Sequence, residues 1–302
     1  MEGKSTVGRE KLRRHLAGSS VNLFYVPALI LVTVFSVYPL FSGFALSLTN
    51  WDGLNPEKTF VGLANYVTML HDANFRTILV NTLIYGVGST IIQQVLGLAL
   101  ALLLNSKIRG RNALLAIIYL PALGSAVIMG TMYYLIFQYQ QGALNTILSA
   151  LGLQKVVWFN NPTTAVVIIL LVNSFQFCGT SMIIYLAGLQ GMDQSVVEAA
   201  SLDGATGWTK FWNITMPMLM PAFSTSVVLN LIGGLKLFDV IKVLTGGGPG
   251  YSTHSISTYI SSVYFDNQNA GYASAIGVVL FIIIAVVTGL MNKGLDKLGW
   301  ES

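Results

Sequence analysis

The 26 residues from 164 to 189, TAVVIILLVNSFQFCGTSMIIYLAGL, contain no charged side chain. A helix needs about 20 such residues to cross the hydrocarbon core of a bilayer, so this stretch is long enough to span a membrane. The chain has five more long charge-free runs: 15–51, 77–106, 112–154, 211–235 and 267–292. A transmembrane β-barrel would instead show alternating segments of about 10 residues. The pattern predicts an all-α, polytopic membrane protein.

The composition of the whole chain agrees with this fold class. Of its 302 residues, 54% are hydrophobic and 9% are charged, and the mean hydropathy is +0.67. Soluble domains carry about 25% charged residues, so a soluble enzyme, a nucleic-acid-binding domain and a disordered chain are all excluded. The net charge of +4 does not call for a nucleic-acid partner, because membrane proteins collect Lys and Arg in their cytoplasmic loops.

Turn signals divide the charge-free runs into six predicted transmembrane spans. These spans are Leu23–Leu48, Ile78–Leu104, Ala113–Phe137, Thr164–Leu189, Met218–Leu237 and Gly271–Met291. A further uncharged stretch, 243–265, contains the run GGGPG and four consecutive polar residues, STHS. Unsatisfied backbone groups are costly in lipid, so we expect this stretch to be an exposed loop with a short surface helix.

The distribution of basic residues predicts the orientation in the membrane. Eleven Lys and Arg residues fall on the side that holds both chain ends, and five fall on the other side. Cytoplasmic loops carry the excess of Lys and Arg, so both termini are expected in the cytoplasm. We expect a cytoplasmic N-terminal segment at 1–20 and a single transmembrane domain at 21–302, with a distinctive cytoplasmic loop at 191–217.

The cysteine and histidine residues indicate no disulfide and no metal site. Cys178 is the single cysteine, so it has no intrachain partner. The three histidines, His15, His71 and His254, lie far apart in the sequence. Their separations do not match the spacing of metal ligands.

The cytoplasmic loop 191–217 has its own helical pattern. The segment VEAASLDGATGW, residues 197–208, reads as a short helix that ends near Gly204, since glycine commonly follows the last helical residue. Pro217 suits the first turn of the next helix. From the residues alone, this helix either lies on the membrane surface or receives another protein.

The same residues resemble the EAA loop of the membrane subunits of binding-protein-dependent ABC importers. In that family the pattern is Glu-Ala-Ala, three residues, Gly, nine residues and Ile-x-Leu-Pro. Glu198-Ala199-Ala200, Gly204, Ile214 and Pro217 keep both spacings. Met216 stands where Leu is usual, which is a substitution of similar volume.

The resemblance extends along most of the chain. FVGLANY at 60–66, Leu120-Pro121 and GALN at 142–145 are similar to segments of these permeases. LTGGGP at 244–249 resembles the carbohydrate-uptake group, the type represented by the larger membrane subunit of the maltose transporter. We do not expect the extra N-terminal spans or the large outer domain of that subunit within these 302 residues.

This resemblance implies a type I ABC importer transmembrane domain in a bacterial or archaeal cell (inner) membrane. The implied role is a non-enzymatic pore subunit, without a cofactor, that carries a sugar or polyol. Glycerol phosphate is an alternative solute, because the basic residues Arg76, Lys155 and Lys236 lie near the outer ends of predicted spans. The implied partners are a second homologous permease, two cytoplasmic ATP-binding subunits and an extracytoplasmic solute-binding protein. The sequence contains no G-x-x-x-x-G-K-[ST] phosphate loop. An ATPase of this kind requires that motif, so its absence is consistent with ATP hydrolysis in separate subunits.

The resemblance also assigns the residues that couple to the ATPase. Glu198 is expected to meet a basic residue of an ATPase subunit. Ala199 and Ala200 are expected to permit close packing, and Gly204 to turn the chain. The rest of the expected coupling set is Asp203, Ile214 and Pro217.

Polar residues within two spans indicate a solute path. Asn173, Phe177 and Thr180 share one helix face, and so do Asn230 and Gly234. Their functional role is the starting hypothesis because polar residues inside membranes are costly. The alternative is that Asn173 and Asn230 join helices by hydrogen bonds, as Asn and Ser commonly do in membranes. The resemblance favours sugar-contacting positions for both.

An ion-coupled secondary transporter is the alternative function. Such transporters normally place carboxylates or broken helices near the midplane to bind the coupling ion. None of the six predicted spans holds Asp or Glu at its centre, which favours the ABC importer.

Overall fold

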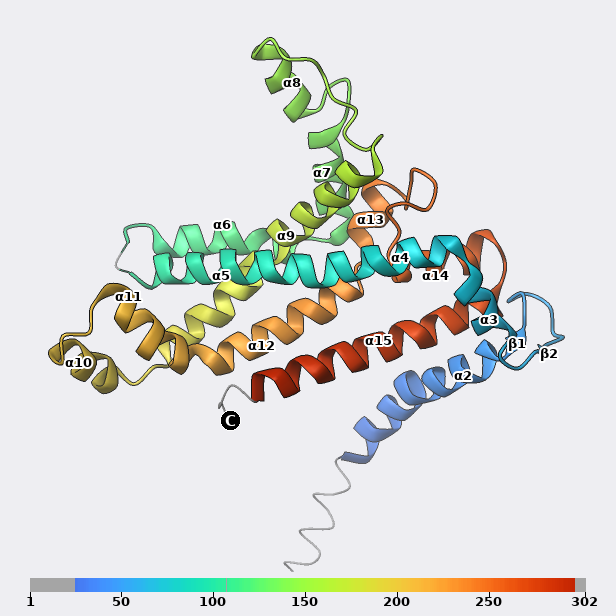
Figure 1. The fold of residues 1–302 in the computed structure, drawn as a ribbon, viewed down its shortest axis with the longest axis horizontal. Helices are drawn as coiled ribbons and strands as arrows, with labels where there is room; N and C mark the ends of the chain where they lie inside the picture. Colours follow the sequence, from blue (N-terminus) through green and yellow to red (C-terminus); the bar gives the residue numbers. More distant parts are fainter. Residues whose placement is uncertain (1–24, 107, 297–302) are drawn as a thin grey trace, which may run out of the picture.

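The computed structural model describes residues 25–106 and 108–296. The predicted N-terminal segment 1–20 therefore lies outside the described residues. The described chain is an elongated set of long helices with short elements at both ends (Figure 1). The first helix runs from Tyr25 to Ser47 and includes a π turn, η1 (Thr33–Val37), and helix α2 (Tyr38–Ser47).

The remaining elements are helical apart from one short antiparallel strand pair. In that pair, Thr49 of β1 (Thr49–Asn50) lies opposite Phe60 of β2 (Thr59–Phe60). The helices are α3 (Ala64–His71), α4 (Ala73–Leu83), η2 (Ile84–Gly88), α5 (Ser89–Asn105), α6 (Arg111–Leu123), α7 (Ala126–Phe137), α8 (Ala143–Ala150), α9 (Pro162–Gln190), α10 (Gln194–Leu202), α11 (Gly207–Lys210), η3 (Phe211–Thr215), α12 (Met216–Leu235), α13 (Asp239–Leu244), α14 (Ile256–Ser261), η4 (Ser262–Asp266) and α15 (Ala270–Asp296).

Four continuous helices in the described part of the chain are long and apolar enough to cross a membrane. They are Tyr25–Ser47, Ala73–Asn105, Pro162–Gln190 and Ala270–Leu295, and they coincide with the predicted first, second, fourth and sixth spans. The predicted fifth span coincides with α12, a helix of 20 residues. Six crossings and the orientation of the termini remain predictions.

The predicted third span, Ala113–Phe137, is not one straight helix. Helices α6 and α7 meet at an angle of 101°. Gly124 and Ser125 both have extended backbone angles at this break, and Pro121 lies inside the last turn of α6. Proline supplies no N–H for a helical hydrogen bond, which weakens the helix just before the break. Helix α7 consequently turns away from the direction of α6 and packs beside the N-terminal part of α9, and α8 projects further out (Figure 1).

The expectation of an exposed loop with a short helix within 243–265 is only partly correct. Gly246, Pro249 and Gly250 are exposed and α14 supplies a short helix, but Thr253, His254 and Ser255 are buried, at 0%, 5% and 0% exposure. The Asn81 side chain donates hydrogen bonds to the backbone oxygens of Ser252 (2.6 Å) and His254 (3.3 Å). The Tyr85 hydroxyl donates to the Thr253 oxygen at 3.0 Å. This polar segment can be buried because these donors, distant in sequence, satisfy its backbone.

Helix α9 is the centre of the packing and contacts α5, α6 and α12. Small residues allow these close approaches. A Cβ added at Gly97 of α5 would lie 2.4 Å from the Ser181 Cβ of α9. A Cβ added at Gly179 of α9 would lie 2.6 Å from the backbone oxygen of Ile118 in α6. Glycine at these positions sets how closely the helices can pack.

Two groups of short elements lie at opposite ends of the long helices, and the segment with α8 stands apart from both (Figure 1). Helix α10 lies at the end where the α5–α6 connection is found, whereas β1, β2, α3 and α14 lie at the other end. We refer to the two as the α10 end and the α14 end.

Candidate functional site

A cavity of about 370 Å³ lies beside α9 and α12. A cavity of this size is in the range of small-molecule sites, about 300–1,000 Å³. Its wall includes all five residues that the sequence predicts for a solute path: Asn173, Phe177, Thr180, Asn230 and Gly234. The structure therefore brings the two predicted helix faces together. Its other lining residues are Gln93, Ala126, Gln176, Leu229, Gly233, Lys236, Leu237, Phe238, Asp239 and Val240.

Asn230 both lines the cavity and joins two helices. Its Nδ2 donates a hydrogen bond of 2.5 Å to the Ser181 hydroxyl of α9, and its side chain is 8% exposed. Asn173 is 2% exposed, and its backbone oxygen accepts a hydrogen bond from Gln93. Asn230 can therefore line the solute path and join α9 to α12 at the same time.

Gly234 lines the cavity and also allows α12 to pack closely against η2. A Cβ at this position would lie 2.8 Å from the Gly86 Cα and 2.8 Å from the Tyr85 oxygen. Both contacts are with backbone atoms of η2. A larger residue at position 234 would therefore push α12 away from η2.

Sequence reasoning missed part of the cavity wall. Gln93 comes from α5, and Lys236 and Asp239 come from the segment at the C-terminal end of α12 and the start of α13. The available signal for Gln93 was a polar residue inside an apolar span. That signal does not say which neighbouring helix the residue faces.

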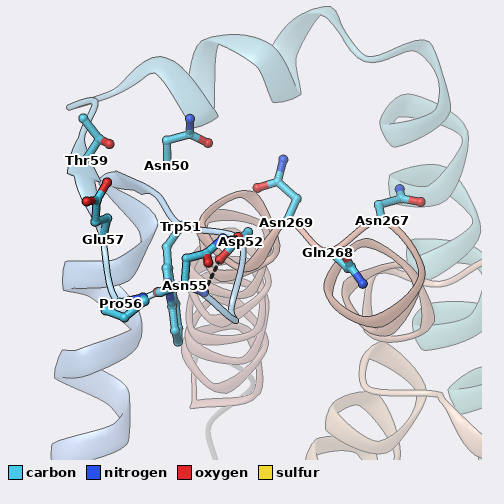
Figure 2. Close-up of a pocket in the computed structure, with 10 residues that line it drawn as sticks. All are labelled: Asn50, Trp51, Asp52, Asn55, Pro56, Glu57, Thr59, Asn267, Gln268 and Asn269. Atoms are coloured by element: carbon cyan, nitrogen blue, oxygen red, sulfur yellow. Dashed lines mark hydrogen bonds between the residues drawn. The ribbon is translucent and has the colours of Figure 1, made fainter.

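A second cavity, of about 610 Å³, lies at the α14 end between the β1–β2 loop and the η4–α15 connection (Figure 2). Its lining residues are Asn50, Trp51, Asp52, Asn55, Pro56, Glu57, Thr59, Asn267, Gln268 and Asn269. It shares no residue with the first cavity. None of its lining residues was predicted as part of a site.

The β1–β2 loop beside this second cavity is held by its own hydrogen bonds. The Asp52 carboxylate accepts bonds from the backbone N–H groups of Leu54 and Asn55, both at 2.9 Å. These bonds lower the pKa of Asp52. The Trp51 indole donates to the Asn55 oxygen at 2.7 Å, and the Lys58 ammonium lies 4.3 Å from the centre of the Trp51 ring. These contacts hold the β1–β2 loop in one defined conformation.

The helix predicted before Gly204 is present as α10. Asp193 caps it by accepting hydrogen bonds from the Ser195 N–H (2.9 Å) and the Ser195 hydroxyl (2.8 Å). These two bonds lower the pKa of Asp193, so the capping carboxylate is ionised at neutral pH. Gly204 has φ +83°, a left-handed conformation that glycine adopts without steric cost. Gly204 therefore turns the chain where the sequence predicts.

The predicted coupling residues differ in their accessibility. Glu198, Ala199, Asp203 and Gly204 are exposed, and Ile214 and Pro217 are half-buried. Ala200 is 9% exposed and is part of the core. Ala199 and Ala200 were expected to permit close packing. The Ala200 methyl group is covered by this chain, and the approach of another subunit to these residues stays a prediction.

Three large apolar side chains near α10 are exposed and were not predicted as part of the coupling surface. Leu202, Trp208 and Trp212 are 89%, 74% and 51% exposed. Trp208 stacks on Phe211 at 5.7 Å between ring centres, and Trp212 meets both rings edge-on. Exposed apolar clusters of this kind mark contacts with another protein or with the membrane.

Long apolar helices around a cavity lined by apolar, amide and hydroxyl side chains, with an exposed helix at one end, define a membrane-embedded solute-transport subunit. Residues 93–298 match the family described as binding-protein-dependent transport system inner membrane component. The chain belongs to this family. It is therefore an integral inner-membrane permease of the ABC importer type, and the family favours this function over ion-coupled transport.

Several known proteins are similar in sequence over nearly the whole chain. The probable ABC transporter permease protein YurN of Bacillus subtilis is 34% identical, covering 92% of this chain and 96% of YurN. The trehalose/maltose transport system permease protein MalF of Thermococcus litoralis is 35% identical, covering 88% and 90%. The lactose transport system permease protein LacF of Rhizobium radiobacter is 33% identical, covering 95% and 97%.

The fold is also similar to a solved structure. A chain of a bacterial ABC transporter involved in the import of the acidic polysaccharide alginate superposes with a TM-score of 0.81. The sequences are 24% identical, and the match covers 98% of this chain and all of the other. This likeness supports the type I ABC importer permease fold.

Proposed function

We propose that this chain forms one half of the pathway through which a sugar or related polyol, delivered by an extracytoplasmic binding protein, enters the cell. The observation that carries the proposal is the cavity beside α9 and α12, because it gathers the five predicted pathway residues. Relatives named for trehalose/maltose and lactose transport support the carbohydrate class.

The chemistry of the cavity suits an uncharged, hydroxylated solute. Its wall includes the largely buried amides of Asn173, Gln176 and Asn230 and the hydroxyl of Thr180. Amides and hydroxyls both donate and accept hydrogen bonds, as sugar hydroxyls do. Phe177 adds an aromatic side chain to the same wall. The charged side chains of Lys236 and Asp239 are exposed and would meet the solute only near the α14 end.

The connectivity of the chain offers a route from ATP hydrolysis to the cavity. Helix α9 is joined to α10 by residues 191–193, and the chain returns through α11 and η3 into α12. The two helices beside the cavity are therefore the two that carry the loop with Glu198. A movement of α10, driven by closure of separate ATPase subunits, would displace both walls and shift the population between two cavity conformations.

The other partners of the family fit at the remaining surfaces. A second permease would complete the pathway, and two ATPase subunits would bind at the α10 end. The extracytoplasmic binding protein would approach the α14 end, where the second cavity opens between Trp51 and Asn269 (Figure 2). The exposed apolar faces of the long helices would meet lipid or the second permease.

The proposal is tested by measuring whether uptake depends on ATP or on an ion gradient. In membrane vesicles that contain the chain with its partner permease, ATPase and binding protein, uptake of maltose, trehalose or lactose is expected to require internal ATP. Uptake should persist when ionophores collapse the proton and sodium gradients. Uptake that follows an ion gradient and ignores ATP would overturn the proposal in favour of secondary transport.

Substitution of the two asparagines by leucine is expected to separate solute contact from helix joining. Asn173→Leu removes an amide without breaking a side-chain bond between helices. It should raise the half-saturating concentration of the transported solute and leave thermal unfolding of the detergent-extracted complex nearly unchanged. Asn230→Leu also removes the bond to Ser181, so unfolding should become easier by about 0.6 kcal/mol, the mean for such bonds in membranes.

Transport kinetics and thermal unfolding of both variants check this prediction. Asn173→Leu with unchanged transport kinetics would remove Asn173 from the solute path. A loss of stability for Asn173→Leu equal to that for Asn230→Leu would assign both residues to helix joining.

A further inference from the structure

Gln93 brings a third long helix, α5, to the wall of the cavity beside α9 and α12. Its side chain is 2% exposed. Its Nε2 donates a hydrogen bond of 3.2 Å to the backbone oxygen of Asn173 on α9. The amide of Gln93 is thus held directly against the turn of α9 that carries a predicted pathway residue.

This hydrogen bond determines which way the Gln93 amide points. A backbone oxygen can only accept, so the atom of Gln93 that faces it is the NH₂ group. The amide oxygen, Oε1, then points elsewhere. It is buried and has no hydrogen-bond donor among the residues that the structure describes.

A buried carbonyl oxygen without a donor is unfavourable, and each such case needs a physical explanation. Gln176 of α9 lines the same cavity, is also 2% exposed, and likewise has a buried Oε1 without a donor in the described chain. Two unpaired acceptors therefore come from different helices that border one cavity. A donor that enters the cavity would relieve both.

We propose that Gln93 is a specificity-determining residue of the solute path, which accepts a hydrogen bond from a hydroxyl of the solute, with Gln176 as a second acceptor. Both oxygens are covered when the cavity is empty, so a small rotation of each amide accompanies binding. This inference rests on the proposed transport function and names the recognised group. Hydroxyl-rich neutral solutes supply donors, whereas the anionic oxygens of carboxylates and phosphates supply only acceptors.

The neighbouring residue Gln94 provides a matched control. It has the same side chain on the same helix, but its Oε1 accepts a hydrogen bond from the Tyr185 hydroxyl, and it does not line the cavity. Gln94 is 8% exposed, which is more than Gln93. Surface exposure alone therefore predicts that position 94 is the more accessible of the two, and the proposal predicts the opposite.

Cysteine labelling distinguishes these outcomes. The Gln93→Cys and Gln94→Cys variants would be made in a Cys178→Ser background, since Cys178 is the single native cysteine. The assembled transporter in membrane vesicles would be treated with a small, charged methanethiosulfonate reagent. Gln93→Cys is expected to be labelled, and Gln94→Cys to remain unlabelled. Equal labelling, the reverse order, or no labelling of Gln93→Cys would overturn the proposal.

Solute protection then tests whether a hydroxyl-rich solute occupies the cavity beside position 93. Maltose, trehalose, lactose and glycerol would each be added before the reagent, with sodium sulfate as the anionic comparison, because sulfate has no O–H donor at neutral pH. At least one neutral solute, at about two to nine times its half-saturating concentration, should slow the labelling of Gln93→Cys by about three- to tenfold, because the bound solute covers the thiol. Protection by sulfate alone, or by no solute, would contradict the contact.

The labelling result and the transport function can fail separately. Labelling reports access to the cavity whether or not ATP drives uptake. If Gln93→Cys is labelled and protected but uptake follows an ion gradient, the proposed ABC function fails and the Gln93 contact stands. If uptake requires ATP but Gln93→Cys is not labelled, only the Gln93 contact fails.

Discussion

Replacement of Glu198 by lysine is expected to abolish ATP-driven uptake while the protein remains in the membrane. Glu198 is exposed on α10, so the substitution should change the free energy of unfolding by no more than about 0.5 kcal/mol. The family resemblance places the carboxylate against a basic residue of the ATPase. Lysine would put two positive charges together in a buried contact, and such like-charge contacts cost several kcal/mol.

Uptake in vesicles and the amount of protein in the membrane measure this effect. Gln190→Lys is a suitable control, because Gln190 is exposed at the last residue of α9, outside α10. The control adds a lysine at the same end of the molecule and should keep normal uptake. Normal uptake by Glu198→Lys would show that this carboxylate does not couple to the ATPase.

A methyl group added at Gly97 is expected to destabilise the whole helix packing. A Cβ there would lie 2.4 Å from the Ser181 Cβ and 3.0 Å from the Met182 nitrogen, which is too close for any real contact. Helices α5 and α9 would have to separate, and overpacking of this kind costs about 1–3 kcal/mol. Gly97→Ala should therefore lower the unfolding temperature of the detergent-extracted complex.

Gly289 allows the same substitution where space is free. It lies in α15, and no atom of the described chain comes within 4 Å of the position of its Cβ. Gly289→Ala should leave the unfolding temperature unchanged or raise it, since alanine is better than glycine in a helix by up to about 1 kcal/mol. Equal unfolding temperatures for Gly97→Ala and Gly289→Ala would show that the close approach of α5 and α9 is not needed for stability.

The coupling loop could be predicted in outline but not in its exposed surface. The motif spacing placed a helix before Gly204, and α10 with its left-handed glycine is present. Ala199 and Ala200 were both expected to permit close packing, and only Ala200 is covered by its own chain, whereas Ala199 is exposed. Trp208 and Trp212 were not predicted, although both are exposed. A short amphipathic segment does not reveal which apolar residues its own chain will cover.

The sequence by itself determined where the long helices lie. Runs without charge indicate membrane spans because a charged group in hydrocarbon is so costly that its absence is informative. The same argument located polar residues such as Asn173 and Asn230 and marked them as functional candidates. Local residues were sufficient for these predictions, since each depends on how one segment partitions between water and lipid.

Only the tertiary structure decided how these helices meet. The break between α6 and α7, the burial of the loop around His254 by Asn81, and the meeting of Gln93 with Asn173 all depend on contacts between distant segments. In a soluble helix, the apolar face identifies the core. In a membrane, lipid is as apolar as the protein interior, so hydrophobicity does not distinguish the face that meets lipid from the face that meets another helix.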